Sequence, residues 1–265
     1  MRVNILVFIK QVADAEARIM ISGDGKTLEI DNKYVTNFFD EFAIEEAIRI
    51  RDTIKEGQVT VCTYGPARAI ETLRTAIAMG ADKAFLIDST NYESEDPAIT
   101  ARILAAFAAQ KGYDLILCGR RAIDDENAII GPMMAEFLGI VHVSSVTGVD
   151  IVDGAGIRVV GEIEGGRKIS DIVLPALLTT QKGLNEPRVP LITGVMKAMR
   201  TEIPTVDPLS LGIAKEQIDT DAAKVMVLSY EPPLQRPPVE IIEGASPEEK
   251  VKNLIQALRE DAKVI

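Results

Sequence analysis

The chain has 265 residues, of which 47% are hydrophobic and 26% are charged. A chain of this length and composition can bury one large core, or one core and a small lobe. Its formal net charge of -11 argues against a basic face, so binding to the phosphate backbone of nucleic acid is excluded as a general function.

Short β-rich runs alternate with segments of helical spacing along the first half of the chain. This alternation predicts right-handed βαβ units and a mostly parallel sheet with helices on both faces, so the predicted fold class is α/β. Gly65-Pro66 fits a strand-to-helix turn, and Gly80 fits a helix stop. The strand-like runs lie at 2–9, 58–64, 83–88 and 114–118, and the helical segments at 40–56, 67–79, 97–111 and 127–138.

The pattern changes after residue 140. Runs 142–152 and 157–166 are separated by DGAG, which is a hairpin signal. A further run, 169–181, follows a second turn at Gly165-Gly166. We expect these three runs to be antiparallel additions to the sheet.

The last part of the chain carries different signals. From Lys182 to about Val239 it is rich in proline and poor in long apolar runs, so we expect an extended arm rather than a second core. An amphipathic helix then begins with Ser246 at the N-cap, Pro247 at the first helical position and two glutamates in the first turn. A terminal helix beyond an arm is typical of a segment that packs on a neighbouring subunit.

No catalytic constellation or metal-ligand cluster stands out. His142, the only histidine, has no nearby serine or cysteine at a nucleophile elbow, which favours a structural role. Cys62 and Cys118 lie inside apolar runs and are expected to be small buried hydrophobes. The phosphate-loop pattern GxxxxGK[ST] and a GxGxxG after the first strand are both missing. Any chemistry must therefore come with a cofactor.

The start of the chain bears on its compartment. It opens on the apolar run RVNILVFI, without a charged leader region, a small-residue cleavage site or an 18-residue apolar stretch. We therefore expect neither export nor a membrane span, and a reducing, cytoplasmic compartment.

Three acids at 124–126 follow the strand-like run that ends at Gly119, at the edge where open α/β sheets bind ligands. If the next helix starts at 127, these acids lie in its first turn, where carboxylates cap free amides and complement the helix dipole. In a ligand-binding interpretation, amides at 127–131 hold a phosphate, Arg120 or Arg121 supplies positive charge, and Asp124 meets a ribose hydroxyl or caps the helix. The residues alone leave helix capping and ligand binding both open.

The stretch GRRAIDDENAIIG (119–131) resembles the G-[KR]-Q-A-I-D-[DG]-D motif of the β subunits of electron transfer flavoproteins. Five further segments are similar to the family's pattern, in the same order and over nearly the whole chain. They are NILVFIKQV (4–12), NFFDEFAIEEAIR (37–49), GPARAIETLRTAIAMGAD (65–82), EIEGG (162–166) and LNEPRVPLITGVMKA (184–198).

The resemblance implies a Rossmann-like fold of the adenine nucleotide α-hydrolase type, with antiparallel additions and a C-terminal arm. It implies pairing with a larger α subunit, whose FAD lies near the subunit junction and relays electrons between an acyl-CoA or other flavin dehydrogenase and a quinone reductase or other acceptor. On this basis the nucleotide-binding domain covers residues 1–182, a partner-recognition loop covers 183–200, and an arm and helix packing on the α subunit cover 201–265. The β subunit is then an electron-carrier subunit and not a complete enzyme.

The resemblance also places the family's nucleotide contacts on this chain, at strand ends and the loops that follow them. For Phe8 and Tyr64, ordinary packing at the rim of the core is an equally good interpretation. The positions are Phe8, Asn37, Phe38, Phe39, Asp40, Tyr64, Gly119, Arg120, Arg121, Ala122, Ile123, Asp124, Asp125, Glu126, Asn127, Ala128, Ile129 and Ile130.

The bound nucleotide is AMP in most members of the family and a second FAD, which accepts a hydride from NADH, in electron-bifurcating members. Asp125 matches the AMP pattern, whereas Ala128 and Gly131-Pro132 match the flavin pattern. The flavin pattern has a glycine where this chain has Asp125. The Asp125 side chain leaves a ligand less room to approach the backbone than glycine does, which argues against the bulkier FAD, so we favour AMP.

The segment that begins with Leu184, Asn185, Glu186, Pro187 and Arg188 resembles the family's recognition loop, which anchors partner dehydrogenases through an apolar side chain. Ile192 takes the place where the family has leucine, a change that keeps the volume; a loop packed into the core is the alternative interpretation. Glu162 falls on a family position near the shared flavin, but it follows Gly161 where arginine is common, which puts an ion pair there in doubt.

Two other classes of function stay open. A stand-alone enzyme such as an ATP pyrophosphatase needs a Gly/Ser-rich phosphate loop after the first strand, which KQVADAEAR (10–18) does not provide. A nucleotide-sensing interaction protein without redox work would bind AMP or ATP but no flavin.

Overall fold

The computed structural model describes residues 2–152, 156–236 and 238–265. It divides into two compact units, the first ending at Ser229 and the second covering Tyr230–Ile265. Several residues after 200, Leu211 and Ile218 among them, are buried in the core of the first unit.

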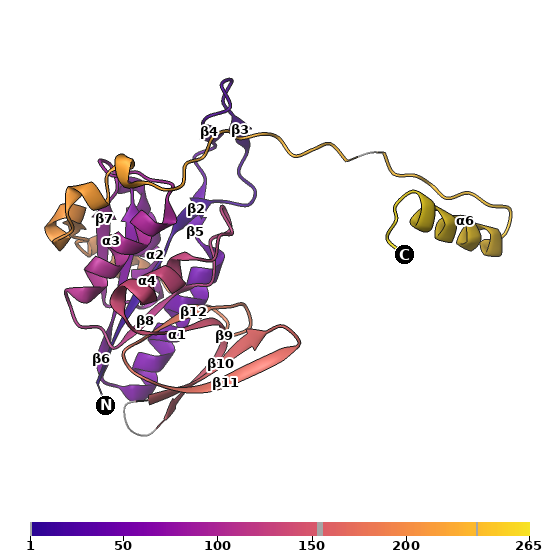
Figure 1. Ribbon diagram of the computed structural model, residues 1–265. Helices are drawn as coiled ribbons and strands as arrows, with labels where there is room; N and C mark the ends of the chain where they lie inside the picture. Colours follow the sequence, from indigo (N-terminus) through magenta and orange to yellow (C-terminus); the bar gives the residue numbers. More distant parts are fainter. Residues whose placement is uncertain (1, 153–155, 237) are drawn as a thin grey trace. The chain divides into compact units, whose positions relative to one another are not determined.

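A nine-stranded sheet organises the first unit, with the strand order β11-β10-β9-β12-β8-β1-β6-β7-β13 (Figure 1). Neighbouring strands are parallel throughout the part of the sheet with the order β9-β12-β8-β1-β6-β7-β13. At the other end, β10 pairs antiparallel with both β9 and β11. Their bounds are β1 (Val3–Phe8), β6 (Gly57–Gly65), β7 (Lys83–Asp88), β8 (Leu115–Gly119), β9 (Val141–Val152), β10 (Gly156–Ile163), β11 (Gly166–Val173), β12 (Ala176–Thr180) and β13 (Thr205–Val206).

Helices cover both faces of the sheet, as the alternating pattern predicts. One apolar cluster joins the sheet to α1, α2 and α5, and a second cluster joins the opposite face to α3, α4 and a short helix, η2. The α/β prediction is therefore confirmed. The helices are α1 (Phe38–Ile54), α2 (Ile70–Met79), α3 (Pro97–Ala109), α4 (Ile130–Leu138), α5 (Ile192–Arg200), and the 3-10 helices η1 (Ala67–Ala69), η2 (Pro208–Leu211), η3 (Lys215–Gln217) and η4 (Thr220–Ala222).

Along the chain, two small antiparallel pairs of strands come between β1 and α1. The pairs are β2 (Gln11–Ala13) with β5 (Tyr34–Thr36) and β3 (Ile19–Ile21) with β4 (Leu28–Ile30). The sequence does not predict them, because three residues are too few to show an alternating pattern.

The expectation of three antiparallel additions is wrong for part of the segment after residue 140. The run 169–181 is split near Pro175 into β11 and β12, since proline has no N–H for a ladder and is confined to strand starts and edges. β12 lies between β8 and β9 and is parallel to both, so only the β9–β10–β11 end of the sheet is antiparallel. Of the predicted DGAG turn, residues 153–155 lie outside the described residues; Val152 and Gly156 pair across it.

Local signals at helix ends are confirmed. Pro66 precedes η1, and Gly80 ends α2 with φ 130°, a conformation that only glycine adopts readily. In the second unit, α6 (Pro247–Glu260) begins as predicted, with the Ser246 hydroxyl accepting a hydrogen bond from the N–H of Glu249. The helix buries none of its residues within the described chain, and Val251, Leu254 and Ile255 are exposed.

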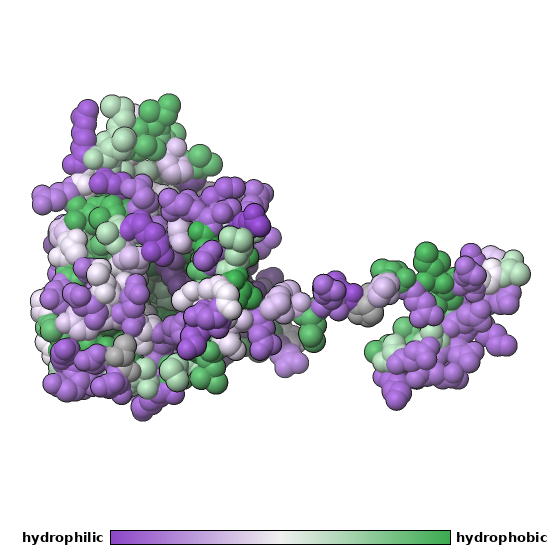
Figure 2. Space-filling view, turned by 90° about the horizontal axis from the view of Figure 1, so that it is seen from above, coloured by the Kyte–Doolittle hydropathy of each residue, from purple (hydrophilic) through white to green (hydrophobic). Residues whose placement is uncertain are grey.

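The surface is mainly hydrophilic where Figure 2 shows it. On the face drawn in Figure 2, hydrophilic residues prevail and hydrophobic residues form separate patches. No helix in residues 2–152, 156–236 and 238–265 is long and apolar enough to cross a membrane.

Candidate functional site

The candidate site lies at the carboxyl ends of the neighbouring strands β1 and β8, from which the chain leaves to opposite faces of the sheet. β1 has β6 on one side and β8 on the other, and Phe8 is in register with both Cys62 and Cys118. The chain leaves β1 toward α1 on one face of the sheet, whereas it leaves β8 toward α4 on the opposite face. The loops after β1 and β8 therefore diverge at their carboxyl ends, which is the geometry that creates a binding crevice in open α/β sheets.

Asp40, in the first turn of α1, bridges these two strand ends. Its carboxylate accepts hydrogen bonds from the N–H of Lys10 and the N–H of Gly119, each at 2.7 Å. Asp40 is buried, and burial raises the pKa of its carboxyl to about 7, although the two N–H donors act in the opposite direction. Asp40 thus ties the end of β1 to the end of β8.

Asn37, which precedes α1, holds the loop after β8. Its amide nitrogen donates to the Arg121 carbonyl at 2.9 Å, and its amide oxygen accepts from the N–H of Ile123 at 3.1 Å. One side chain therefore pairs with both a donor and an acceptor of the loop backbone, which fixes the loop in place. Residues 119–123 and 37–40, predicted to lie at one edge, are indeed together.

The three acids do not cap a helix, so that interpretation is wrong. α4 begins at Ile130 instead of 127, its N-cap is Ile129, and its first turn holds no acid. The acids lie in the preceding loop, where Asp124 and Asp125 accept hydrogen bonds from the Lys10 ammonium at 2.8 and 3.1 Å. The single positive charge of Lys10 therefore offsets part of the negative charge that would otherwise repel a phosphate.

The rest of the loop is held by its own hydrogen bonds and carries an arginine. Glu126 and Ala128 have φ of 52° and 57°, and the N–H groups of residues 125 to 127 all donate to acceptors inside the loop. Arg121 lies 3.3 Å from the Glu126 carboxylate, and its guanidinium carbon is 5.3 Å from the Phe39 ring centroid. Its Nε is buried without a hydrogen-bond partner among the described residues.

Glycine is required where α4 meets the strand ends. A Cβ on Gly131 would lie 2.4 Å from the Thr179 methyl carbon and 3.3 Å from the Cys118 sulfur. The first turn of α4 therefore lies directly on β12 and β8, with no side-chain cap over its amides. Helix starts of this kind attract anions.

Two aromatic residues predicted at the edge have partners inside the protein. The Phe8 ring is buried and packs edge-to-face on Phe107, with 6.4 Å between ring centroids. The Tyr64 hydroxyl donates a hydrogen bond to the Tyr92 carbonyl, and burial raises the pKa of the phenol well above its ordinary value. Their contact with a nucleotide stays a prediction.

Two residues of the site were missed in the sequence. Lys10 directly follows the first strand, a position that could have marked it, whereas nothing local marks Thr180. The buried Thr180 hydroxyl donates to the Phe39 carbonyl at 2.9 Å, and the Thr180 carbonyl accepts from the N–H of Arg120. The end of β12 thus supports both halves of the crevice.

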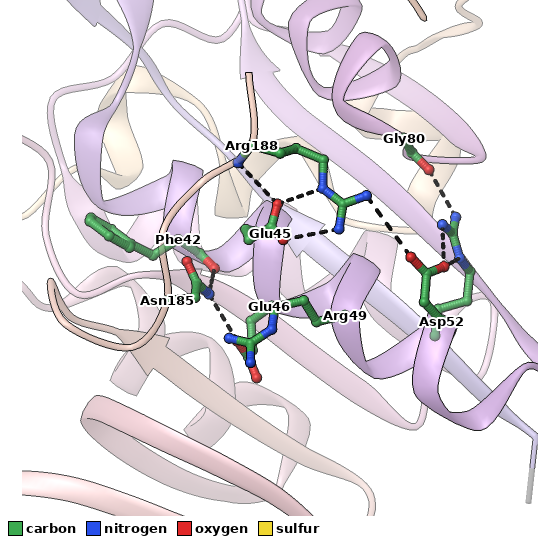
Figure 3. Close-up of polar contacts among 9 residues, drawn as sticks. Phe42, Glu45, Glu46, Arg49, Asp52, Gly80, Asn185 and Arg188 are labelled. Atoms are coloured by element: carbon green, nitrogen blue, oxygen red, sulfur yellow. Dashed lines mark hydrogen bonds and ion pairs between the residues drawn. The ribbon is translucent and has the colours of Figure 1, made fainter. Parts of the chain in front are cut away.

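The predicted recognition segment is held at one end and exposed at the other. Leu184 is buried, whereas Asn185 and Arg188 form hydrogen bonds with α1 (Figure 3). What was predicted as a loop becomes a helix at Ile192, the start of α5, and this side chain is 80% exposed. The alternative of a core-packed loop is therefore wrong for Ile192.

Glu162 lies exposed on β10, and its carboxylate accepts a hydrogen bond from Gln181 at 3.4 Å. Gly161 before it sits at a register shift, where a Cβ would approach the Ser144 carbonyl oxygen to 3.1 Å. The contact is tight for a side chain at 161, where the resemblance leads us to expect arginine.

The remaining chemistry-bearing residues have structural surroundings. Cys62 and Cys118 are free and buried, as predicted, and burial raises the pKa of both thiols. Burial lowers the pKa of His142, in β9. The described residues contain no group of three or more His, Cys, Asp or Glu that could hold a metal ion.

Comparisons with known proteins agree with this geometry. Residues 26–211 match the family model described as "Electron transfer flavoprotein domain". The chain is 37% identical over 257 residues to the electron transfer flavoprotein subunit beta of Thermoanaerobacterium thermosaccharolyticum, covering 96% of this chain and 97% of that relative. It is 33% identical to the subunit beta of Bradyrhizobium diazoefficiens, covering 94% and 98%, and 35% identical to that of Homo sapiens, covering 88% and 90%.

Proposed function

Because the chain belongs to the electron transfer flavoprotein family, we propose that it is the β subunit of a cytoplasmic heterodimer that carries electrons from dehydrogenases to an acceptor. The α subunit and this chain hold one FAD near their junction, and that FAD supplies the redox chemistry. The donors are acyl-CoA or other flavin dehydrogenases, and the acceptor is a quinone reductase or a comparable protein. The exposed apolar residues of α6 suit packing on the α subunit.

The crevice between β1 and β8 holds AMP in this proposal, and the observation that carries it is the loop at 119–130. The buried Nε of Arg121 lacks a partner among the described residues, and a donor of this kind suits a phosphate oxygen. The uncapped start of α4 supplies further donors. Lys10 offsets one of the two negative charges, on Asp124 and Asp125, that would oppose an anion.

The predicted nucleotide residues then divide by role. Asn37, Asp40 and Gly119 shape the crevice, because their polar groups are occupied by the protein itself. Residues 120–130 line it. AMP bound there would have a structural role, since it would tie the loop to the strand ends without taking part in electron transfer.

A second FAD in place of AMP is the alternative, and Ala128 with Gly131-Pro132 is the feature that favours it. A subunit with this second flavin would accept a hydride from NADH. Asp125 argues against it, because its side chain is held against Lys10 where a flavin-holding loop has glycine.

The stoichiometry of released nucleotides tests the proposal. We expect the purified heterodimer, once denatured, to release one FAD and one AMP, as measured by chromatography against standards. Two FAD and no AMP would identify the bifurcating alternative. AMP or ATP without flavin would identify a nucleotide-sensing protein without redox work.

The docking surface in this proposal is the exposed face of α5. Ile192, Val195, Met196 and Met199 follow helical spacing i, i+3, i+4 and i+7, and each is at least 43% exposed. The opposite side of α5 lies on α2, where a Cβ on Gly194 would be 2.3 Å from the Ala78 carbonyl oxygen. The helix therefore turns small residues to the protein and large apolar residues to solvent, which suits an apolar pocket of a dehydrogenase.

Replacing Ile192 by alanine is expected to slow reduction of the heterodimer by an acyl-CoA dehydrogenase while the flavin content stays unchanged. An exposed anchor contributes docking energy of roughly 1–3 kcal/mol and touches no cofactor. Stopped-flow reduction against dehydrogenase concentration measures the effect. Val225→Ala is the matched control, since Val225 is also exposed but belongs to the segment beyond η4. Equal rates for wild type and Ile192→Ala would place the anchor elsewhere.

A further inference from the structure

Two neighbouring glutamates on α1 hold the segment that leads to α5 (Figure 3). The Glu45 carboxylate accepts hydrogen bonds from Arg188 Nε at 2.7 Å, from Arg188 Nη2 at 2.9 Å and from the Arg188 backbone N–H at 3.2 Å. One carboxylate therefore fixes both the side chain and the main chain of residue 188. Glu45 is 5% exposed, and Arg188 is its ion-pair partner among the described residues.

Glu46 fixes the same segment three residues earlier. The Asn185 amide donates to the Glu46 carboxylate at 2.8 Å and to the Phe42 carbonyl at 3.0 Å. Arg49, one turn further along α1, lies 3.3 Å from the same carboxylate. The segment between Asn185 and Arg188 is thus attached to α1 at both of its ends.

The network continues to the helix on which α5 rests. Arg188 lies 3.9 Å from the Asp52 carboxylate, and Asp52 also pairs with Arg51 at 2.8 Å. Arg51 donates to the carbonyl of Gly80, at the end of α2. From the other side, Arg74 of α2 donates to the Ala198 carbonyl of α5 at 2.6 Å. Helices α1, α2 and α5 are therefore joined by side chains as well as by apolar packing.

An ion pair with a buried carboxylate contributes little net stability, because desolvation offsets most of the attraction, but its bidentate geometry fixes orientation. Arg188 stands four residues before Ile192, and Pro187 and Pro190 leave the intervening backbone few conformations. The N-cap of α5, Leu191, gives that helix start no side-chain cap. The contacts of Arg188 are thus the polar attachment that precedes Ile192 most closely along the chain.

We propose that Glu45 and Arg188 are positioning residues for dehydrogenase docking, which hold the start of α5 so that Ile192 and its neighbours meet the partner in one orientation. This inference rests on the docking role proposed above. Neither residue touches the crevice between β1 and β8, so their effect is on docking and not on the bound nucleotide.

The test uses Glu45→Gln in the purified heterodimer, with an acyl-CoA dehydrogenase reduced by its acyl-CoA substrate. Glutamine keeps the volume, but its NH2 group cannot accept from the guanidinium, so the bidentate pair is lost. We expect the apparent KM for the heterodimer to rise about tenfold with kcat unchanged, because misplacement of a docking group weakens encounter without altering the flavin. Flavin and nucleotide content, and the rate of reduction by dithionite, are expected to match wild type.

A second variant and a control make the result decisive. Arg188→Lys keeps the charge without the planar fork, so its KM is also expected to rise, and this variant stands in if Glu45→Gln does not fold. Lys215→Gln, which removes an exposed pair with Asp219 next to the other apolar cluster, is expected to leave KM unchanged. Hydrogen exchange is expected to quicken at 192–196 and to stay constant in α2.

The outcomes separate the inference from the function on which it rests. If Ile192→Ala raises KM but Glu45→Gln and Arg188→Lys do not, the positioning role is wrong and the docking role stands. If none of the three variants changes KM, the docking role itself is wrong. A fall in kcat or a loss of flavin in Glu45→Gln would show a general structural role and overturn the inference.

Discussion

Gly119→Ala is expected to destabilise the protein and to empty the crevice of its nucleotide. The new Cβ would lie 2.3 Å from Asp40 Oδ1 and 2.9 Å from the Phe39 carbonyl carbon. The backbone of α1 cannot withdraw without losing the Asp40 bridge between Lys10 and Gly119. Overpacking of this kind costs about 1–3 kcal/mol.

Urea unfolding of the full chain measures the loss of stability, followed by circular dichroism because the chain has no tryptophan. Chromatography of the denatured heterodimer measures the nucleotide. Gly23→Ala is the matched control, since a Cβ there meets nothing within 4 Å. If both variants unfold at the same urea concentration and hold the same nucleotide, the close approach at Gly119 does not shape the crevice.

Asp40 is expected to make stability depend on pH between about 4 and 7. Burial raises the pKa of its carboxyl from the ordinary 3.8 to about 7, so over this range the folded chain holds a proton that the unfolded chain has lost. Its contribution is fully present below pH 3.8 and is lost as the pH rises toward 7. The slope is at most about 1.4 kcal/mol per pH unit, the free energy of one pKa unit.

Comparison with Asp40→Asn isolates this contribution, because asparagine does not titrate. The free energy of unfolding of wild type minus that of the variant is expected to fall from pH 4 to pH 7 and to be constant above. Asp171→Asn is the control: Asp171 is exposed, and its hydrogen bond with Arg158 lowers its pKa, so no slope is expected in this range. A difference that rises with pH below 4 would mean that the N–H donors of Lys10 and Gly119 outweigh burial.

The position of Gly119 at the end of a strand could be predicted from the sequence, whereas the pairing inside the loop that follows could not. Apolar runs ending at glycine placed Gly119 at a carboxyl strand end, and that end is where parallel sheets bind ligands. The acids at 124–126 are predicted to cap a helix because such a prediction depends only on the few residues next to the expected helix start. In the structure, Asp124 and Asp125 accept hydrogen bonds from Lys10, which lies 114 positions before Asp124. This pairing depends on β1 lying beside β8.

The sequence by itself determined the elements whose signals are local. Periodicity and turn residues set the βαβ units, and the side-chain cap at Ser246 set the start of α6, because each depends on neighbours within about one helical turn. Only the tertiary structure decided that β12 lies between β8 and β9, that α4 begins at Ile130, and that Glu45 holds Arg188 across 143 positions. Strand order and helix packing bring such residues together, and they result from burial of the whole chain rather than from any short segment.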